Sequence, residues 1–457
     1  MGFKDEFVWG AATSSYQIEG AAAEDGKGKN IWDVYVKEPG KIYQGHTGEV
    51  ACDHYHRYKE DVKIMKQMGL KGYRFSINWA RVLPEGTGKI NEKGIEFYNK
   101  LIDELLEAGI EPYVTLYHWE LPYALYQKGG WMNRDIAEWF GEYAGLVSER
   151  FSDRVKNFFT LNEPQCFVGL GFLTGEHAPG LHAPLRDTFL MAHNALRAHG
   201  RAVQMLRKNA KQPIKIGYAP TAGMTYPATD RPEDIEAARE ALFSMPDLQN
   251  WTWNVAWWSD PVILGKYPDE GMKLYEPYLP EITEEDMRLI SEPIDIYGQN
   301  IYNGRCIRMG KEGKPEEVKR YDGFPRTANN WPVTPESLYW GPKFLYERYK
   351  KPIYITENGL SCHDVVSLDG KVHDFARIDF LERYLSELKR AAEDGVDIGG
   401  YFQWSLLDNF EWNYGYMERF GLVYVDYRNQ KRIWKDSAYW YRDLIRRNGE
   451  SLLGIQE

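Results

Sequence analysis

The chain has 457 residues, of which 43% are hydrophobic and 15% are aromatic, and its formal net charge is −11. A nucleic-acid binder usually shows a basic face, so this acidic balance argues against one. No apolar stretch is long enough to cross a bilayer, and the first residues lack the basic-then-apolar order of a signal peptide. The four cysteines form no paired spacing, which favours a reduced compartment, so we expect a cytoplasmic protein without a membrane partner.

Short apolar strands alternate with amphipathic helices along most of the chain. After a first strand over 8–12, the apolar positions Val62, Met65 and Met68 recur at helical spacing and predict a helix that ends at Gly69. A strand over 72–77 follows at once. The same order of helix, glycine and strand recurs before the strands predicted at 112–117 and 399–404. This repeated order is typical of a parallel sheet.

The number and spacing of these units indicate the fold class. The predicted strands lie at 8–12, 72–77, 112–117, 156–161, 214–220, 295–301, 352–357 and 399–404. Eight such units without a dominant glycine-rich phosphate loop favour a closed (β/α)8 barrel of the TIM type over an open doubly wound sheet. We expect the long segments 165–213, 221–294 and 303–350 to be insertions on the top of the barrel. No linker composition divides the chain, so we predict one domain over 1–457.

Two of the predicted strands end in a glutamate. An apolar run over 158–161 leads into Asn162, Glu163 and Pro164, and a second run over 352–355 leads to Glu357. In a (β/α)8 barrel the carboxyl ends of the strands meet at one face, where active sites lie. The two carboxyl groups would therefore share one pocket, although 194 residues separate them in sequence (357 − 163).

A pair of glutamates without metal-type ligands nearby suggests acid–base and nucleophilic chemistry on an acetal. One carboxyl must keep its proton to protonate a leaving oxygen, and the other must be ionised to attack the anomeric carbon. Arg74, at the tip of the second strand, is the expected cation beside Glu357. Each glutamate alone could equally form a structural ion pair, and matching positions at two strand tips favour catalysis.

The two glutamates lie in longer motifs, TLNEP at 160–164 and YITENG at 354–359. Other motifs follow nearly from end to end of the chain: FVWGAATSSYQIEG at 7–20, YRFSINW at 73–79, YHWELP at 117–122, WSLLDNFEW at 404–412 and RFGLVY at 419–424. In this order, the motifs resemble glycoside hydrolase family 1, the retaining β-glucosidase family.

The resemblance implies roles for individual residues. Glu163 would be the general acid/base and Glu357 the nucleophile, supported by Arg74, Tyr302 and Asn300. The residues expected to bind substrate are Gln17, His118, Trp119, Asn162, Trp331, Trp404, Glu411 and Trp412. The pair of imidazoles in His54 and His56 has no carboxylate cluster at ligand spacing, so we expect no metal site there.

We therefore predict a retaining β-glucosidase that acts on terminal β-glucosyl residues of short oligosaccharides or aryl and alkyl glycosides, without a cofactor. Retention requires a carboxyl separation of about 5 Å, against about 8 Å for inversion. The sequence leaves open the ranking of glucose, galactose and fucose, and it leaves open the oligomeric state, a homo-oligomer included. The alternatives are a 6-phospho-β-glycosidase, which Glu411 argues against, and a sugar-binding barrel without catalysis.

Overall fold

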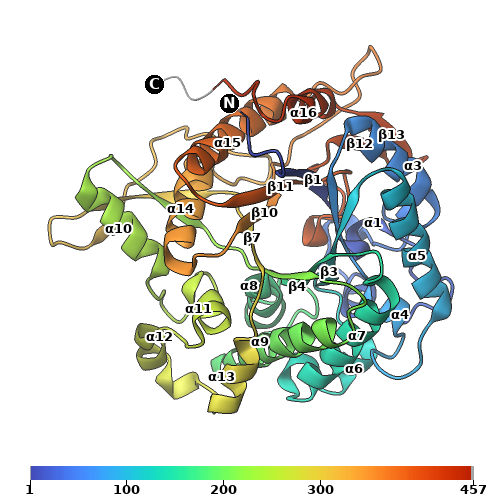
Figure 1. The fold of residues 1–457 in the computed structure, drawn as a ribbon, viewed down its shortest axis with the longest axis horizontal. Helices are drawn as coiled ribbons and strands as arrows, with labels where there is room; N and C mark the ends of the chain where they lie inside the picture. Colours follow the sequence, from blue (N-terminus) through green and yellow to red (C-terminus); the bar gives the residue numbers. More distant parts are fainter. Residues whose placement is uncertain (1, 454–457) are drawn as a thin grey trace.

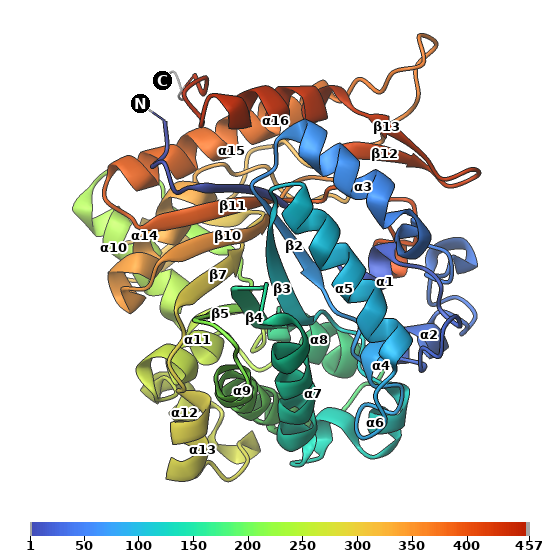
Figure 2. The same cartoon turned by 45° about the vertical axis from the view of Figure 1, so that its right-hand side comes forward.

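The computed structural model describes residues 2–453, and its centre is a closed barrel of eight parallel strands (Figures 1 and 2). The strands follow one another around the barrel in the order β1-β11-β10-β7-β5-β4-β3-β2. Their bounds are β1 Val8–Ala12, β2 Gly72–Ser76, β3 Glu111–Tyr117, β4 Asn157–Asn162, β5 Lys215–Ala219, β7 Ile296–Asn300, β10 Ile353–Asn358 and β11 Ile398–Trp404. Every predicted strand is present, and no predicted boundary differs from the observed one by more than one residue.

Helices surround the barrel on the outside (Figure 1). The helix predicted to end at Gly69 is α3, and Gly69 adopts φ 78°, a left-handed conformation that glycine allows, so its N–H can bond back to Met65 and Lys66. The longer helices are α3 His54–Met68, α5 Glu92–Glu107, α7 Ile136–Phe151, α9 Leu185–Lys208, α10 Pro232–Phe243, α11 Ala256–Leu264, α14 Ser337–Tyr349, α15 Phe375–Glu393 and α16 Asp436–Arg446.

Short elements fill the connections between these. The short helices are α1 Ser15–Ile18, α2 Ile31–Tyr35, η1 Tyr43–Gly45, α4 Trp79–Val82, α6 Tyr123–Gln127, η2 Gly130–Met132, α8 Pro164–Val168, η3 Gly169–Leu173, α12 Asp269–Leu274, η4 Glu276–Tyr278, α13 Glu284–Ile290 and η5 Trp412–Tyr414. Two small sheets lie outside the barrel, β6-β8-β9 (Met224–Pro227, Gly304–Met309 and Pro315–Glu317) and the antiparallel hairpin β12-β13 (Val423–Asp426 and Lys431–Trp434).

The prediction that 165–213, 221–294 and 303–350 are wholly insertions is wrong, because each of these segments contains a helix of the outer ring, α9, α11 and α14 respectively. In the first segment, α9 packs along α7: the Ser148 hydroxyl donates to the carbonyl of Leu206 at 2.7 Å. Gly141 of α7 lies against Arg201 and Met205 of α9, where a β-carbon would come within 2.7 Å of the Arg201 side chain. Fourteen of the α9 residues are buried, which explains why so long a helix is stable at this position.

Aromatic side chains fill the interior of the barrel below its carboxyl-terminal end. Tyr113, Phe159 and Phe402 are buried there, and the rings of Tyr113 and Phe402 meet edge to face with centroids 4.9 Å apart. Trp404 and Phe420 belong to the same cluster and lie nearer the carboxyl ends of the strands. The packed interior leaves the site at the top of the barrel, as in other barrels of this type. Within residues 2–453, no helix is both long and apolar enough to cross a membrane.

Candidate active site

A cavity of about 370 Å³ lies at the carboxyl ends of the strands. Both predicted catalytic glutamates line it: Glu163 follows directly after β4, and Glu357 is the penultimate residue of β10. The strand tips therefore bring together two carboxyl groups that lie far apart in sequence, as predicted. The predicted residues that share the wall are His118, Trp119, Tyr302, Trp331, Trp404, Glu411 and Trp412.

Local sequence fixes the direction in which Glu163 leaves its strand. Pro164 starts α8 directly after it, and a residue before proline is disfavoured in the right-handed helical region. Glu163 instead adopts φ 44° and ψ 68°, a left-handed conformation. Trp119 and Trp412, which line the same cavity, also have positive φ values of 86° and 52°. Such conformations cost about 1–3 kcal/mol each and are concentrated at functional sites.

Glu357 is held by two donors. Arg74 of β2 donates from Nη1 to Oε1 of Glu357 at 2.7 Å, and the Tyr302 hydroxyl donates to Oε2 at 2.8 Å. Arg74 is 1% exposed, so its charge is compensated inside the protein and not by water. Burial raises the pKa of Glu357, while Arg74 and Tyr302 act in the opposite direction by stabilising the carboxylate.

Glu163 has a different environment. Burial, followed by the negative charge of Glu357, raises the pKa of Glu163 to about 7. The hydrogen bonds that oppose this shift come from Asn300, whose Nδ2 lies 2.7 Å from Oε1, and from the thiol of Cys166, 3.1 Å from Oε2. Of the two carboxyl groups, only that of Glu357 bonds to the Arg74 guanidinium, which favours the ionised form of Glu357 and leaves the proton on Glu163. The two carboxyls therefore have the separated proton affinities that a general acid and a nucleophile require.

Asn162 connects both carboxyl environments. Its side-chain oxygen accepts from Arg74 at 2.6 Å and from Asn300 at 3.0 Å, so its Nδ2 is the group left to face His118 Nε2, at 3.2 Å. The indole of Trp119 donates to the backbone carbonyl of Asn162 at 3.0 Å. Burial, with a smaller effect of Arg74, places the pKa of His118 well below its usual value, so this imidazole is neutral.

The far side of the cavity carries a third carboxyl group. Burial, followed by the charge of Glu357, raises the pKa of Glu411 to about 8. Gln17 does not line the cavity, but its Nε2 lies 3.3 Å from Oε2 of Glu411 and also donates to the carbonyl of Phe410 at 2.9 Å. Arg74, Asn162 and Asn300 likewise lie behind the lining and contact residues that form it.

Aromatic rings form the walls. The ring of Trp404 stacks on His118 with centroids 5.7 Å apart and an interplanar angle of 16°. Trp412 packs on Trp119 at 4.6 Å, and Trp331 meets Tyr302 edge to face at 5.1 Å. Such rings offer flat apolar surfaces to a ligand while their polar groups bond to the protein.

Sequence reasoning missed part of the lining. Cys166 could have been found, because it lies three residues after Glu163 at the start of a helix and so on the same side. The remaining lining residues come from loops and from the short helices η3 and η5, and they carry no signal of their own in a single sequence: Leu170, Glu176, His177, Thr221, Ala222, Gly223, Trp253, Asn303, Asn413 and Tyr414.

The two histidines set aside as a metal pair have separate partners. His54 Nδ1 lies 2.7 Å from the buried carboxylate of Asp61, whereas His56 faces Asp53 and Glu24 on the surface. Each of these imidazoles thus hydrogen-bonds to neighbouring carboxylates, and the two rings have different partners.

Comparison with known proteins agrees with this geometry. Residues 1–450 match the family model described as Glycosyl hydrolase family 1. The chain belongs to this family. Beta-glucosidase A from Thermotoga maritima is 48% identical over 449 residues, which is 98% of each chain, and Beta-glucosidase A from Acetivibrio thermocellus is 46% identical over 453 residues, 98% of this chain and 99% of the relative. This family 1 member is therefore a glycoside hydrolase.

The barrel is also shared with solved structures of the family. The beta-glucosidase from Thermotoga maritima in complex with glucoimidazole superposes with a TM-score of 0.89 at 48% sequence identity. The alignment covers 98% of this chain and 99% of that one. The expected (β/α)8 fold and the expected family are thus confirmed together.

Proposed function

We propose that the chain is a retaining β-glucosidase that removes terminal β-linked glucose, and by extension galactose or fucose, from short oligosaccharides and aryl or alkyl glycosides. The observation that carries the proposal is the asymmetry between the two glutamates in one cavity. Of the two glutamates, only Glu357 accepts hydrogen bonds from Arg74 and Tyr302, while Glu163 has a pKa raised to about 7.

The first half of the reaction uses both carboxyls at once. Glu357, as the carboxylate, attacks the anomeric carbon while the Glu163 carboxyl gives its proton to the departing glycosidic oxygen. The products are a glycosyl ester on Glu357 and a free alcohol. As the new ester bond consumes the negative charge of Glu357, the repulsion that raises the pKa of Glu163 disappears.

The second half reverses the role of Glu163. With Glu357 esterified, Glu163 is a stronger acid and has become a carboxylate, so it can remove a proton from water. The water oxygen bonds to the anomeric carbon, and Glu357 leaves as the carboxylate that Arg74 stabilises. Two displacements restore the original anomeric configuration.

Recognition of the sugar is assigned to the remaining residues of the site. Gln17 and Glu411 are proposed to bind the hydroxyls remote from the anomeric carbon, and Asn162 and His118 those nearer to it. Trp404 would cover the apolar face of the ring, with Trp412 and Trp119 behind, and Trp331 would contact the leaving group. The stacking of these rings and the contact of Asn162 Nδ2 with His118, which holds both side chains beside the glutamates, support the assignment.

A 6-phospho-β-glycosidase would need cations for its phosphate. Among residues 2–453, neither lysine nor arginine lines the cavity. Instead Glu411 lies there, and Glu418, a second buried carboxyl, acts on it electrostatically. These buried carboxyl groups offer a dianion no compensating charge, so its binding is disfavoured at this side. Turnover of 4-nitrophenyl β-glucoside should exceed that of its 6-phosphate, and the reverse preference would contradict the proposal.

A non-catalytic sugar-binding barrel is the other alternative. It is disfavoured because both glutamates and Arg74 are present and mutually oriented. The test is hydrolysis of 4-nitrophenyl β-glucoside followed by proton NMR, with Glu357→Gln as the comparison. We expect the β-anomer of glucose as the first product and a loss of several orders of magnitude in Glu357→Gln. Undiminished hydrolysis by that variant, or the α-anomer first, would refute the assignment.

Three broader assignments are also proposals. A single domain over 1–457 predicts one calorimetric unfolding transition. Cytoplasmic location is supported by four free cysteines, Cys52, Cys166, Cys306 and Cys362, and cell fractionation tests it. Static light scattering will establish whether the chain forms a homo-oligomer.

A further inference from the structure

The loop over 409–420 carries an entire wall of the cavity. Glu411, Trp412, Asn413 and Tyr414 all lie on it and all line the cavity. The loop leaves the barrel after β11 and returns before β12, so its shape depends on how its two ends are held.

The ends meet at Asp408. The N–H of Gly421 donates to Oδ1 of Asp408 at 3.0 Å, and the N–H of Asp408 donates to the carbonyl of Val423 at 3.0 Å. Only glycine permits this approach, because a β-carbon on Gly421 would lie 2.1 Å from the backbone nitrogen of Asp408. Asp408 therefore joins the two ends of the loop through Gly421 and Val423, and we call this junction the neck of the loop.

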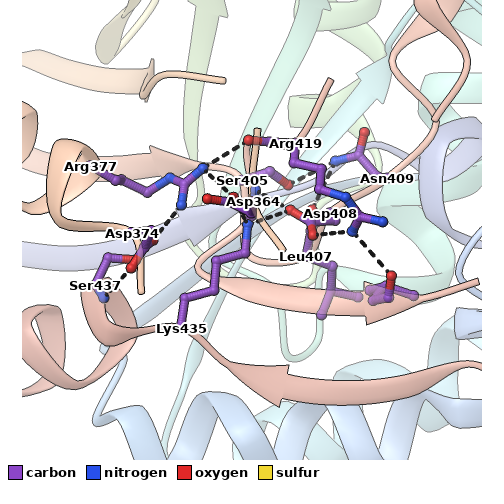
Figure 3. Close-up of polar contacts among 12 residues, drawn as sticks. Asp364, Asp374, Arg377, Ser405, Leu407, Asp408, Asn409, Arg419, Lys435 and Ser437 are labelled. Carbon is purple, nitrogen blue, oxygen red and sulfur yellow. Dashed lines mark hydrogen bonds and ion pairs between the residues drawn. The ribbon is translucent and has the colours of Figure 1, made fainter. Parts of the chain in front are cut away.

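The Asp408 carboxylate is fully buried and receives two cations besides the Gly421 amide. Lys435 Nζ lies 2.7 Å from Oδ1, and Arg419 Nη1 lies 2.6 Å from Oδ2. Lys435 is itself fully buried, and its Nζ also donates to the carboxylate of Asp364 at 2.5 Å. Figure 3 shows how these side chains converge from separate parts of the chain.

The acidic and basic side chains of this buried network are equal in number. Arg377 of α15 donates to Asp364 at 2.9 Å, to Asp374, and to the backbone carbonyl of Arg419 at 2.8 Å. Three aspartates therefore meet three cations: Asp364, Asp374, Asp408, Arg377, Arg419 and Lys435. Removal of one charge from such a buried set leaves another uncompensated, which is costly.

A second set of contacts leads from the neck to the sugar-binding groups. Asn409, next to Asp408, donates to the Ser405 hydroxyl and to the carbonyl of Leu407, each at 3.1 Å. Its side-chain oxygen accepts from Gln17 Nε2 at 3.1 Å, and the same Nε2 lies 3.3 Å from Glu411. A shift of the neck would therefore move Gln17 and Glu411 together.

We propose that Asp408 is a positioning residue for substrate specificity: by closing the neck of the 409–420 loop, it fixes Glu411 and Gln17 for recognition of the sugar hydroxyl opposite the anomeric carbon. This inference rests on the proposed β-glucosidase function. The relevant hydroxyl is the one at C4, which lies across the pyranose ring from C1. Asp408 itself does not line the cavity and acts only through the loop.

The test compares two substrates in each variant. Wild type, Asp408→Asn and Glu411→Gln are assayed with 4-nitrophenyl β-D-glucoside and with its 4-deoxy analogue. Asp260→Asn is the matched control, because Asp260 is also buried and accepts three hydrogen bonds, from Arg348 and Tyr349, on helices α11 and α14 of the outer ring. Thermal unfolding curves ensure that every variant is folded at the assay temperature.

We expect Asp408→Asn to lower kcat/KM for the glucoside by roughly tenfold and to change kcat/KM for the 4-deoxy analogue little, because about one hydrogen bond to the C4 hydroxyl is lost. Glu411→Gln should show the same pattern. Asp260→Asn should leave the ratio between the two substrates unchanged. If Asp408→Asn does not fold, Asn409→Ala carries the same test with the same expected ratio. An equal loss on both substrates, or an unchanged ratio, overturns the inference. A wild-type chain inactive on both substrates would overturn the proposed function itself.

Discussion

The thiol of Cys166 should tune the general acid. Its Sγ lies 3.1 Å from Oε2 of Glu163, and this hydrogen bond lowers the pKa of Glu163 against the larger raising effect of burial. A thiol is a weak donor, so the bond is worth about 0.7 kcal/mol to the carboxylate, which corresponds to about half a pKa unit. In Cys166→Ala the pKa of Glu163 should therefore rise from about 7 by roughly that amount.

The assay is the pH profile of kcat/KM for an aryl glucoside. Glu163 must be protonated in the free enzyme, so its pKa sets the basic limb, and Cys166→Ala should move that limb to higher pH. At pH 8 the protonated fraction would rise about 2.5-fold. Cys166→Ser, with a stronger donor, should place the limb at or below the wild-type position, and Cys306→Ala, a thiol outside the site, should not move it. A shift to lower pH in Cys166→Ala would refute this reasoning.

Three further predictions concern buried charges. Tyr302→Phe should lower kcat by roughly tenfold or more with little change in substrate affinity, since it removes a hydrogen bond to Glu357; equal kcat values in steady-state assays would contradict this. Arg74→Met removes the cation that lowers the pKa of Glu357, so the acid limb of kcat/KM should move to higher pH, and an unmoved limb would show that another group governs it. Arg81→Met leaves the buried carboxylate of Glu19 without its cation, 2.9 Å away, and should lower the free energy of unfolding by about 3–5 kcal/mol in denaturant titration; an unchanged midpoint would count against the pair.

The barrel was predictable because its signals are local. Each predicted strand is a short apolar run bounded by a glycine or a helix, and Gly69 marks a helix end by a backbone conformation that glycine favours. Glu163 and Glu357 were predictable because a polar residue at the end of a buried strand is conspicuous, and the closed barrel then brings strand ends together.

Other features depend on distant contacts. The position of α9 in the outer ring was not predicted, because it depends on packing against α7. The length of α9 does not show that it packs against α7. The closure of the 409–420 loop by Asp408 depends on Lys435, 27 residues away, and on the exact approach of Gly421. Trp253 and Glu176 reach the cavity from loops whose course no periodic pattern encodes.

The most direct measurement of the central claim is the mass of the intact protein after incubation with an aryl 2-deoxy-2-fluoro-β-glucoside, followed by peptide mapping. The fluorine slows both displacements, and a good leaving group lets the ester accumulate. We predict the addition of one fluoroglucosyl group per chain, located on Glu357, and no addition in Glu357→Gln. A label on another residue, or turnover of the unfluorinated substrate without any label, would contradict the two-glutamate account.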